Sequence, residues 1–333
     1  MHLERRLIDF ETIQGKHIIG IDAQSRGYFS PQSVAIIGAS ENPNKVGGRS
    51  IHYMKKFGYS GKIYPINPKY SEIQGLKAYP SLDSLGETPE AVIIAVAGPN
   101  AVQAISECAI RGIKTAVVMS SGFAETGSEG KLLQDHVVAV ARKHGMRLIG
   151  PNSQGIANFH TGAVLNFSTM FMEVNPMDGP IAIISQSGAA SVMPYALLRE
   201  QGYGIRYLAS TGNDADLGVA ELIVEAVQDS YIKLILVYVE SVTDTASYSA
   251  AAKIASQNNV RIIILKGGVS KKGASAAASH TGALVEKSGA LVPFMNGLAI
   301  RVVHDLQEMV NAVGLYLQNG KAGLGSTVVM KIG

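Results

Sequence analysis

The feature that most constrains the fold is a regular alternation of two kinds of segment between Ser33 and Leu265. Short apolar segments rich in Val and Ile, such as Val34–Ile37, alternate with longer segments of helical periodicity. The connections are short, and 36 glycines over the chain supply the tight turns that they need. Such a pattern predicts parallel sheets with helices on both faces, and it places ligand-binding loops at the carboxyl ends of the strands.

The alternation falls into two blocks, separated by an irregular stretch over residues 150–180 that contains GPNSQGIANF. The first block predicts strands at 34–37, 62–66, 91–96, 115–119 and 147–149, and helices at 48–57, 102–111 and 131–144. The second predicts strands at 181–185, 205–209, 234–239 and 261–265, and helices at 190–201, 219–228 and 247–257. Residues 326–330 (STVVM) predict one more strand, which no helix follows.

With 333 residues, 47% of them hydrophobic, the chain is long enough for two compact domains. We expect an N-terminal extension over 1–29, a Rossmann-like domain over 30–150, a linker over 151–175, and a flavodoxin-like domain over 176–315. Residues 316–333 are expected to begin a further domain or to form a tail.

Charge and composition exclude several classes of function. The net charge is only +3 and no block of Lys and Arg forms a stripe, so we expect no nucleic-acid partner. No apolar run reaches membrane-spanning length, and the first residues lack a secretory segment. Cys108 is the single cysteine and lies in a helical pattern, which favours a reduced, cytoplasmic protein without disulfides.

The first loop of the alternating region has the composition of a phosphate site. VAIIGASENPNKVGG, from Val34 to Gly48, reads as a strand, a glycine turn and a helix start, whose backbone amides can hold a phosphate. A nicotinamide site would carry an acid after the second strand, whereas Lys69 stands there and favours a ribose phosphate, as in coenzyme A or NADP. The alternative is a structural turn with a surface lysine.

Two further loops leave the ends of predicted strands of the same sheet, AGPN after the third and SSGFAE after the fourth. Both are small and suited to line the path of a long, thin cofactor, although either one alone would also serve as a plain turn. The candidate cofactor contacts are therefore Gly38, Ser40, Lys45, Gly47, Asn67, Lys69, Ala97, Pro99, Ser121 and Gly122.

The stretch KGGVSKKGASAAASHTGAL follows the predicted strand at 261–265 and cannot pack a core. It predicts a pliant, basic loop that ends at a helix start, where Ser279 can act as the cap. His280 would then stand among free amides and positive helix-dipole potential, which suit a phosphate carried on the imidazole. The alternative is a histidine hydrogen-bonded to its own loop.

An ordered series of motifs, from about Ser30 to Leu306, resembles the NDP-forming acyl-CoA synthetases, and specifically their α part. The series is SVAIIGAS, INPK, GPNSQGI, SQSG, STGND, VYVES and ASHTGAL. The resemblance implies that the first domain binds CoA, that His280 is transiently phosphorylated, and that Glu240 interacts with it. It further implies phosphate contacts from Ser185, Ser187, Gly188 and Gly282, and no metal ligands in this chain. Ser153 stands where the family often has a cysteine, which is not the nucleophile.

The same resemblance implies an incomplete enzyme. No ATP-grasp module is evident, so ATP or ADP with Mg²⁺ is expected on a β subunit or fused domain, and the assembly is expected to be an oligomer. The reaction would interconvert acyl-CoA, ADP and phosphate with a carboxylic acid, CoA and ATP, and the motifs do not specify the acyl group. Two alternatives stay open: a regulatory CoA-binding module of a protein acetyltransferase, and an NADP-dependent oxidoreductase.

Overall fold

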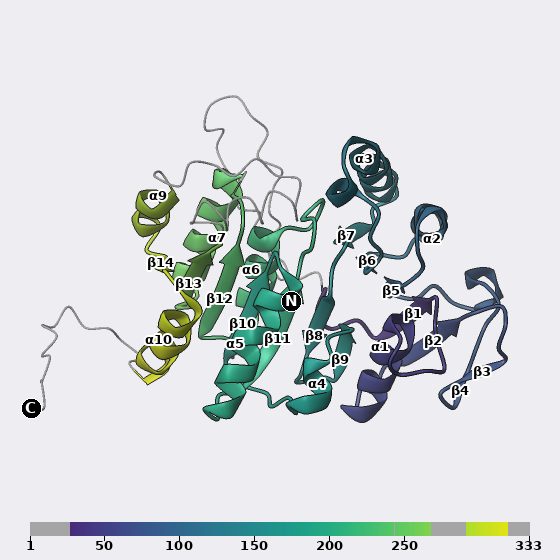
Figure 1. Cartoon of the computed structure of the whole chain (residues 1–333), viewed down its shortest axis with the longest axis horizontal. Helices are drawn as coiled ribbons and strands as arrows, with labels where there is room; N and C mark the ends of the chain where they lie inside the picture. Colours follow the sequence, from purple (N-terminus) through teal and green to yellow (C-terminus); the bar gives the residue numbers. More distant parts are fainter. Residues whose placement is uncertain (1–26, 243, 268–290, 319–333) are drawn as a thin grey trace, which may run out of the picture.

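The computed structural model describes residues 27–242, 244–267 and 291–318, and the fold below is that of these residues. Within them two sheets lie side by side, each covered by helices (Figure 1). His280, Gly282, the N-terminal extension up to residue 26 and the strand expected at 326–330 lie outside the described residues.

The first sheet has five parallel strands in the order β2-β1-β5-β6-β7. Its elements are β1 (Ser33–Ile37), α1 (Val46–Lys56), β2 (Lys62–Ile66), the hairpin β3 (Glu72–Ile73) and β4 (Leu76–Lys77), β5 (Ala91–Ile94), α2 (Pro99–Ile110), β6 (Thr115–Val118), α3 (Ser128–Lys143) and β7 (Arg147–Ile149). Because helices cover both faces, β5 and β6 are buried along their whole length, which explains their unbroken Val and Ile runs.

The second sheet has seven strands in the order β14-β13-β12-β10-β11-β8-β9. Its elements are β8 (Gly155–Asn158), β9 (Ala163–Asn166), α4 (Met170–Glu173), β10 (Ile181–Ser185), α5 (Gly188–Glu200), β11 (Ile205–Ser210), α6 (Val219–Val227), β12 (Leu234–Val239), α7 (Thr245–Gln257), β13 (Arg261–Lys266), α9 (Leu291–Gly297), β14 (Arg301–Val303) and α10 (Leu306–Gln318). Helices α5 and α10 cover one face, and α6 and α7 cover the other.

The structure adds detail to the second sheet and to the boundaries expected around it. Residues 151–175 are not an irregular linker, because β8 and β9 form an antiparallel hairpin that extends the second sheet. The second sheet is therefore mixed rather than purely parallel. β14 continues the sheet beyond β13, and α10 runs across the boundary expected at residue 316. The hairpin escaped prediction because its strands have only four residues each and β8 begins and ends with turn formers, Gly155 and Asn158.

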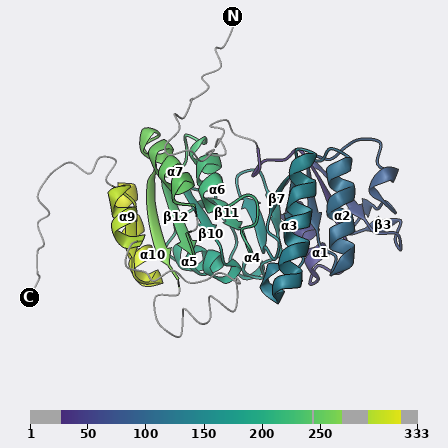
Figure 2. The same ribbon diagram turned by 90° about the horizontal axis from the view of Figure 1, so that it is seen from above.

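The junction between the two sheets is packed and hydrogen-bonded. Helix α1 contacts β9, and the Tyr53 hydroxyl donates to the carbonyl of Ser168 at 2.5 Å. Elsewhere in the junction, the fully buried carboxylate of Asp216 accepts hydrogen bonds from Arg142 at 2.6 Å and from the amide of Leu148 at 2.7 Å. Seen from above, the two domains lie side by side (Figure 2). The loop before α6 is thereby tied to the first domain.

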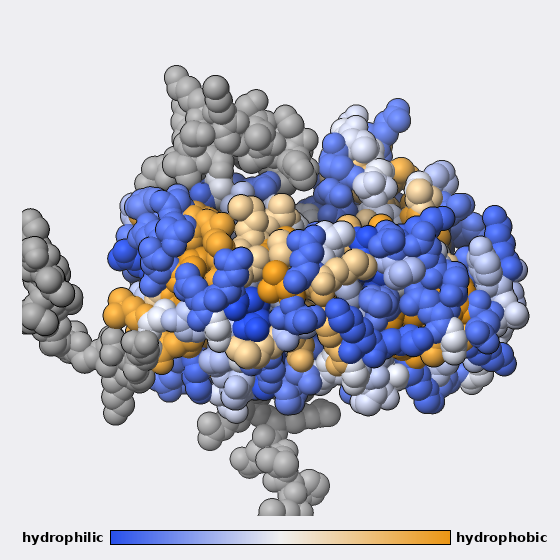
Figure 3. Space-filling model, turned by 60° about the horizontal axis from the view of Figure 1, so that its bottom comes forward, coloured by the Kyte–Doolittle hydropathy of each residue, from blue (hydrophilic) through white to orange (hydrophobic). Residues whose placement is uncertain are grey.

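One face of the molecule is mainly hydrophilic over the first domain, while apolar residues gather toward the end that carries α10 (Figure 3). Leu315 on α10 and Met193 on α5 are 62% and 53% exposed, so part of this apolar character reaches the surface. Among the described residues, no helix has the length and apolarity needed to cross a membrane.

Candidate functional site

Both sheets have the same strand order once their parallel strands are counted along the chain. In each, the first parallel strand lies between the second and the third, at the point where the chain changes direction across the sheet. In the second sheet this first strand is β10, which pairs with β11 on one side and β12 on the other. Open α/β sheets bind ligands outside the carboxyl ends of the strands at such a switch point. The loops after β10 and β12 are therefore the place to search.

A cavity of about 220 Å³ lies at this switch point. It is lined by Asn152, Gln154, Phe167, Gln186, Ser187, Gly188, Ala189, Gly212, Asn213 and Glu240. Ser187, Gly188 and Ala189 form the start of α5, whose first backbone amides lack helical acceptors. A helix start of this kind favours an anion, and Glu240 lines the same cavity.

The turn that begins α5 is built by a buried serine. The Ser185 hydroxyl donates to the carbonyl of Ser187 at 2.6 Å and accepts from its amide at 3.0 Å, and Ser185 is fully buried. Ser185 therefore shapes the loop, whereas Ser187 and Gly188 line the cavity itself. The Ser185 hydroxyl is engaged inside the loop, and its expected contact with a phosphate stays a prediction.

Glu240 follows the last residue of β12 and is only 8% exposed. Tyr238, two residues earlier and therefore on the same side of the strand, hydrogen-bonds to it. Burial and the Glu240 carboxylate together raise the pKa of Tyr238 to about 12, so the phenol stays protonated as a donor. The sequence-based placement of Glu240 at the carboxyl edge of the sheet, beside the SQSG turn, agrees with this arrangement.

The candidate cofactor site of the first sheet also gathers at a switch point, between β1 and β5. Gly38 has φ +88°, and an added Cβ would stand 2.7 Å from the carbonyl oxygen of Ala95. An added Cβ on Gly47 would stand 2.0 Å from the carbonyl oxygen of Gly38. Only glycine allows these two close approaches, which bring the start of α1 against the end of β1. The N-terminus of α1 has no capping side chain, and its N-cap residue Lys45 is exposed.

The remaining candidate contacts lie on the same edge. Asn67 follows β2, donates to the carbonyl of Ala39 at 2.8 Å and accepts from the amide of Lys69 at 3.0 Å. Lys69 is exposed, as are Ala97 and Pro99 at the start of α2 and Ser121 after β6. Ser40 and Gly122 are half-buried. The structure thus places the ten predicted contacts in the loops and first helical turns that follow β1, β2, β5 and β6, with Gly47 buried beneath them.

The STGND loop after β11, to which the sequence analysis assigned no role, connects the two sites. Asn213 donates to the carboxylate of Glu125 at 2.5 Å and to Gln134 at 3.0 Å, both in the first domain. Glu125 in turn accepts from the amide of Gly122 at 2.6 Å and so holds one of the candidate cofactor loops. Burial opposes ionisation of Glu125, but these hydrogen bonds outweigh it and lower its pKa.

The next residue of this loop, Asp214, accepts from the side chain of Gln186 at 2.8 Å. Burial raises the pKa of Asp214 to about 6, against the opposing effect of the Gln186 hydrogen bond. Asn213, Asp214 and Gln186 all lie within quoted motifs, STGND and SQSG. Sequence reasoning missed them because the partners are 28 to 88 positions apart along the chain.

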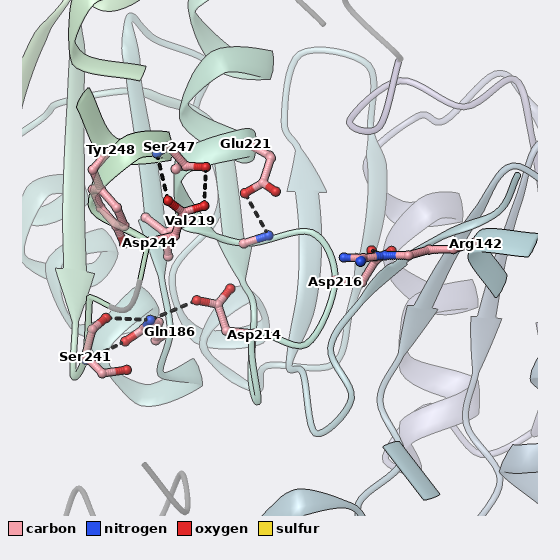
Figure 4. A pocket seen from close by; sticks show the side chains of 12 residues that line it. Arg142, Gln186, Asp214, Asp216, Val219, Glu221, Ser241, Asp244, Ser247 and Tyr248 are labelled. Carbon is pink, nitrogen blue, oxygen red and sulfur yellow. Dashed lines mark hydrogen bonds and ion pairs between the residues drawn. The ribbon is translucent and has the colours of Figure 1, made fainter. Parts of the chain in front are cut away.

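A second cavity, of about 180 Å³, lies on the other side of Gln186 and is lined by four acids (Figure 4). Two of them are already used in helix starts, since Asp244 accepts from the amides of Ala246 and Ser247, and Glu221 accepts from the amide of Gly218. Within the described residues, no group of three or more His, Cys, Asp or Glu side chains is arranged to hold a metal ion. We assign this cavity to the support of the loops.

Comparison with known proteins gives two family matches in succession. Residues 32–158 match the model of a CoA binding domain, and residues 178–316 match that of a succinyl-CoA ligase like flavodoxin domain. The alpha subunit of acetate–CoA ligase [ADP-forming] I from Pyrococcus furiosus is 39% identical over 262 residues, which are 77% of this chain and 55% of that protein. The alpha subunit of enzyme II from the same organism is 34% identical over 292 residues, or 87% and 62%.

A solved structure is similar over the same range. The dinucleotide-forming acetyl-coenzyme A synthetase 1 of Ca. Korarchaeum cryptofilum, in complex with phosphate and ADP, superposes with a TM-score of 0.79 at 29% identity. The match covers 87% of this chain and 61% of that one. The chain therefore spans less than two thirds of the length of these relatives.

Proposed function

The chain belongs to the NDP-forming acyl-CoA synthetases, and on that premise we propose that it acts as the α part of an ADP-forming acyl-CoA synthetase that transfers phosphate through His280. The observation that carries the proposal is the cavity at the β10/β12 switch point, where the N-terminus of α5 and the buried Glu240 lie together. An enzyme that passes a phosphoryl group needs donors for its oxygens and a group that orients the nucleophile. ASHTGAL, which supplies His280, follows β13 in the sequence.

The proposed reaction has three reversible steps. Phosphate attacks the thioester carbonyl of acyl-CoA, the carbon–sulfur bond breaks, and acyl phosphate and CoA result. An imidazole nitrogen of His280 then attacks the phosphorus of acyl phosphate, and the carboxylate leaves. Finally the phosphoryl group passes from His280 to ADP, which gives ATP and restores the histidine. In the second step the Glu240 carboxylate accepts a hydrogen bond from the other ring nitrogen, fixes the tautomer and stabilises the positive charge on the ring.

The first domain fits CoA. Its glycine turn brings the start of α1 against β1, and the free amides there suit a diphosphate, with Gly38, Ser40, Lys45 and Gly47 in contact. Lys69 would meet the ribose phosphate at the end of β2. The loops that carry Ala97, Pro99, Ser121 and Gly122 would line the rest of the molecule.

Charge reversal at Lys69 tests this orientation of CoA. We expect Lys69→Glu to weaken CoA binding by roughly ten- to a hundredfold, the scale of a lost charge-assisted contact with a phosphate. Isothermal titration with CoA and with its 3′-dephospho form makes the comparison, and the wild type should prefer CoA while the variant should not. Lys56→Glu, at the far end of α1, is the matched control. Equal binding of the two ligands by the wild-type chain would remove Lys69 from the site.

The nucleotide step belongs to another module in this proposal. We place ATP or ADP with Mg²⁺ on an ATP-grasp β subunit or fused domain, because the two matched models cover a CoA-binding and a flavodoxin-like domain only. The assembly would be an oligomer of both parts. The acyl group stays open, since the loops that would enclose it follow no motif.

The direct test is labelling without nucleotide. The purified chain, mixed with radioactive inorganic phosphate and a panel of acyl-CoA thioesters, should take up phosphate that is labile in acid and stable in base. Labelling should require an acyl-CoA, since CoA alone supplies no thioester, and free carboxylic acid should chase the label off. Peptide mapping should place the label on His280. Phosphate on Ser187 or another residue, or no labelling with any thioester in the presence of the partner module, would contradict the proposal.

A further inference from the structure

Glu240 occupies an unusual place in the second sheet. The parallel pairing of β10 with β12 ends at Ser185 and Tyr238, and the pairing of β12 with β13 ends at Val239 and Lys266. Glu240 is the next residue of the central strand, so both ladders stop just before it. A residue in that position ordinarily begins a loop, with the freedom that loops have.

Side chains from the two neighbouring strands continue the hydrogen bonding at this residue. The amide of Glu240 donates to the side-chain oxygen of Gln186 at 2.6 Å. The ammonium group of Lys266 donates to the carbonyl of Glu240 at 2.5 Å. Gln186 follows β10, and Lys266 is the last residue of β13. The backbone of Glu240 is therefore held from both sides of its strand.

Both of these side chains are themselves buried and fixed. Gln186 is 7% exposed, and its amide nitrogen donates to Asp214 at 2.8 Å and to the carbonyl of Ser241 at 3.0 Å (Figure 4). Its orientation is determined, because the opposite rotamer would set an NH₂ group against the amides of Glu240 and Ser241. Lys266 is 8% exposed and also donates to the carbonyl of Gly267 at 2.8 Å.

Water can hydrogen-bond the peptide groups at the end of a strand. Burying a lysine and a glutamine there instead is unfavourable unless their polar atoms are hydrogen-bonded. Two long side chains that converge on the peptide groups of one residue indicate that the placement of that residue matters. For a group that orients a nucleophile, a misplacement of about 1 Å can reduce the rate a hundredfold.

We propose that Gln186 and Lys266 are positioning residues that form a clamp on the backbone of Glu240 and so fix where its carboxylate stands in the cavity. Asp214 supports the clamp by holding the amide of Gln186. The inference rests on the proposed function, in which Glu240 orients the phosphorylated histidine. It adds two residues that act by holding the backbone of Glu240.

The physical clamp is tested first, by hydrogen exchange. In Gln186→Met the Glu240 amide loses its acceptor, and we expect it to exchange about tenfold faster, the worth of one hydrogen bond. Amides within β12, such as that of Leu236, should be unchanged. Gln186→Glu keeps an acceptor oxygen but loses the donor to Asp214 and to the carbonyl of Ser241, so it should restore only part of the protection. Gln228→Met, at the C-cap of α6, is the control. Unchanged exchange at Glu240 in Gln186→Met would overturn the clamp.

The effect on phosphate transfer is tested with a double-mutant cycle. Lys266→Met and Gln186→Met should each lower the maximal rate of labelling from acyl-CoA by about 10- to 100-fold, while the half-saturating acyl-CoA concentration stays the same. Lys233→Met, at the opposite end of β12, should leave both values unchanged. In a Glu240→Gln background either substitution should lower the maximal rate of labelling by less than about threefold, because the residue that it positions has lost its function.

The outcomes separate the two hypotheses. Full multiplicative losses in the Glu240→Gln background, or undiminished rates in the single variants, would overturn the clamp while leaving the proposed function in place. A wild-type chain that takes up no phosphate would defeat the proposed function, and the exchange measurement would still decide the clamp. If one variant fails to fold, the other tests the clamp from the opposite side of the strand.

Discussion

We expect His280→Asn to abolish phosphate incorporation from acyl-CoA and inorganic phosphate, and also from ATP when the partner module is present. The expected loss is complete, because the amide of asparagine resembles the imidazole in size and polarity but offers no nucleophilic nitrogen to the phosphorus. Labelling, followed by treatment with acid and with base, measures the effect. Because the proposed nucleophile is outside the first domain, CoA binding and the melting temperature should match the wild type.

The unchanged CoA affinity of His280→Asn is the internal control of this experiment. It shows that the variant is folded and that its first domain is competent. Undiminished labelling in His280→Asn would defeat the assignment. A further check is release of CoA from acyl-CoA and phosphate, which precedes the histidine step and should survive in the variant as a single-turnover event.

We expect Glu240→Gln to reduce the rate of labelling by about 10²–10⁴-fold, the usual contribution of a positioned acid–base partner. Glutamine has the shape of glutamate, so the clamp from Gln186 and Lys266 onto the backbone should persist. What is lost is the negative charge that fixes the tautomer of the histidine and stabilises the positive ring. Rapid-quench labelling at saturating acyl-CoA isolates this step from binding.

The extent of labelling distinguishes a kinetic role from a lost site. In Glu240→Gln the final extent should approach that of the wild type, since the nucleophile is intact, and only the rate should fall. Glu200→Gln, at the end of α5, is the matched control. A rate within about threefold of wild type, below the range expected for a positioned acid–base partner, would show that Glu240 does not orient the nucleophile.

The sequence by itself determined the α/β class, the two blocks of alternation and most of the elements. The boundaries of β2, β7, β10 and β12 agree with the expected ranges, because short, mainly apolar segments between turn residues predict strands without reference to their partners. The motifs likewise identified the glycine turn, the SQSG turn and Glu240. Each of these is a local signal, since strand, turn and helix start follow one another within about fifteen residues.

Only the tertiary structure decided which of these pieces meet. That β8 and β9 extend the second sheet depends on pairing with β11, which lies some fifty residues further along the chain. That Gln186 and Lys266 meet the backbone of Glu240 depends on the strand order, in which β10 and β13 flank β12. Hydrogen bonds between residues so far apart leave no periodic trace, because either partner alone is an ordinary loop or strand-end residue. The residue types of the proposed site could therefore be predicted from the sequence, while their geometry depends on the packing of the sheet.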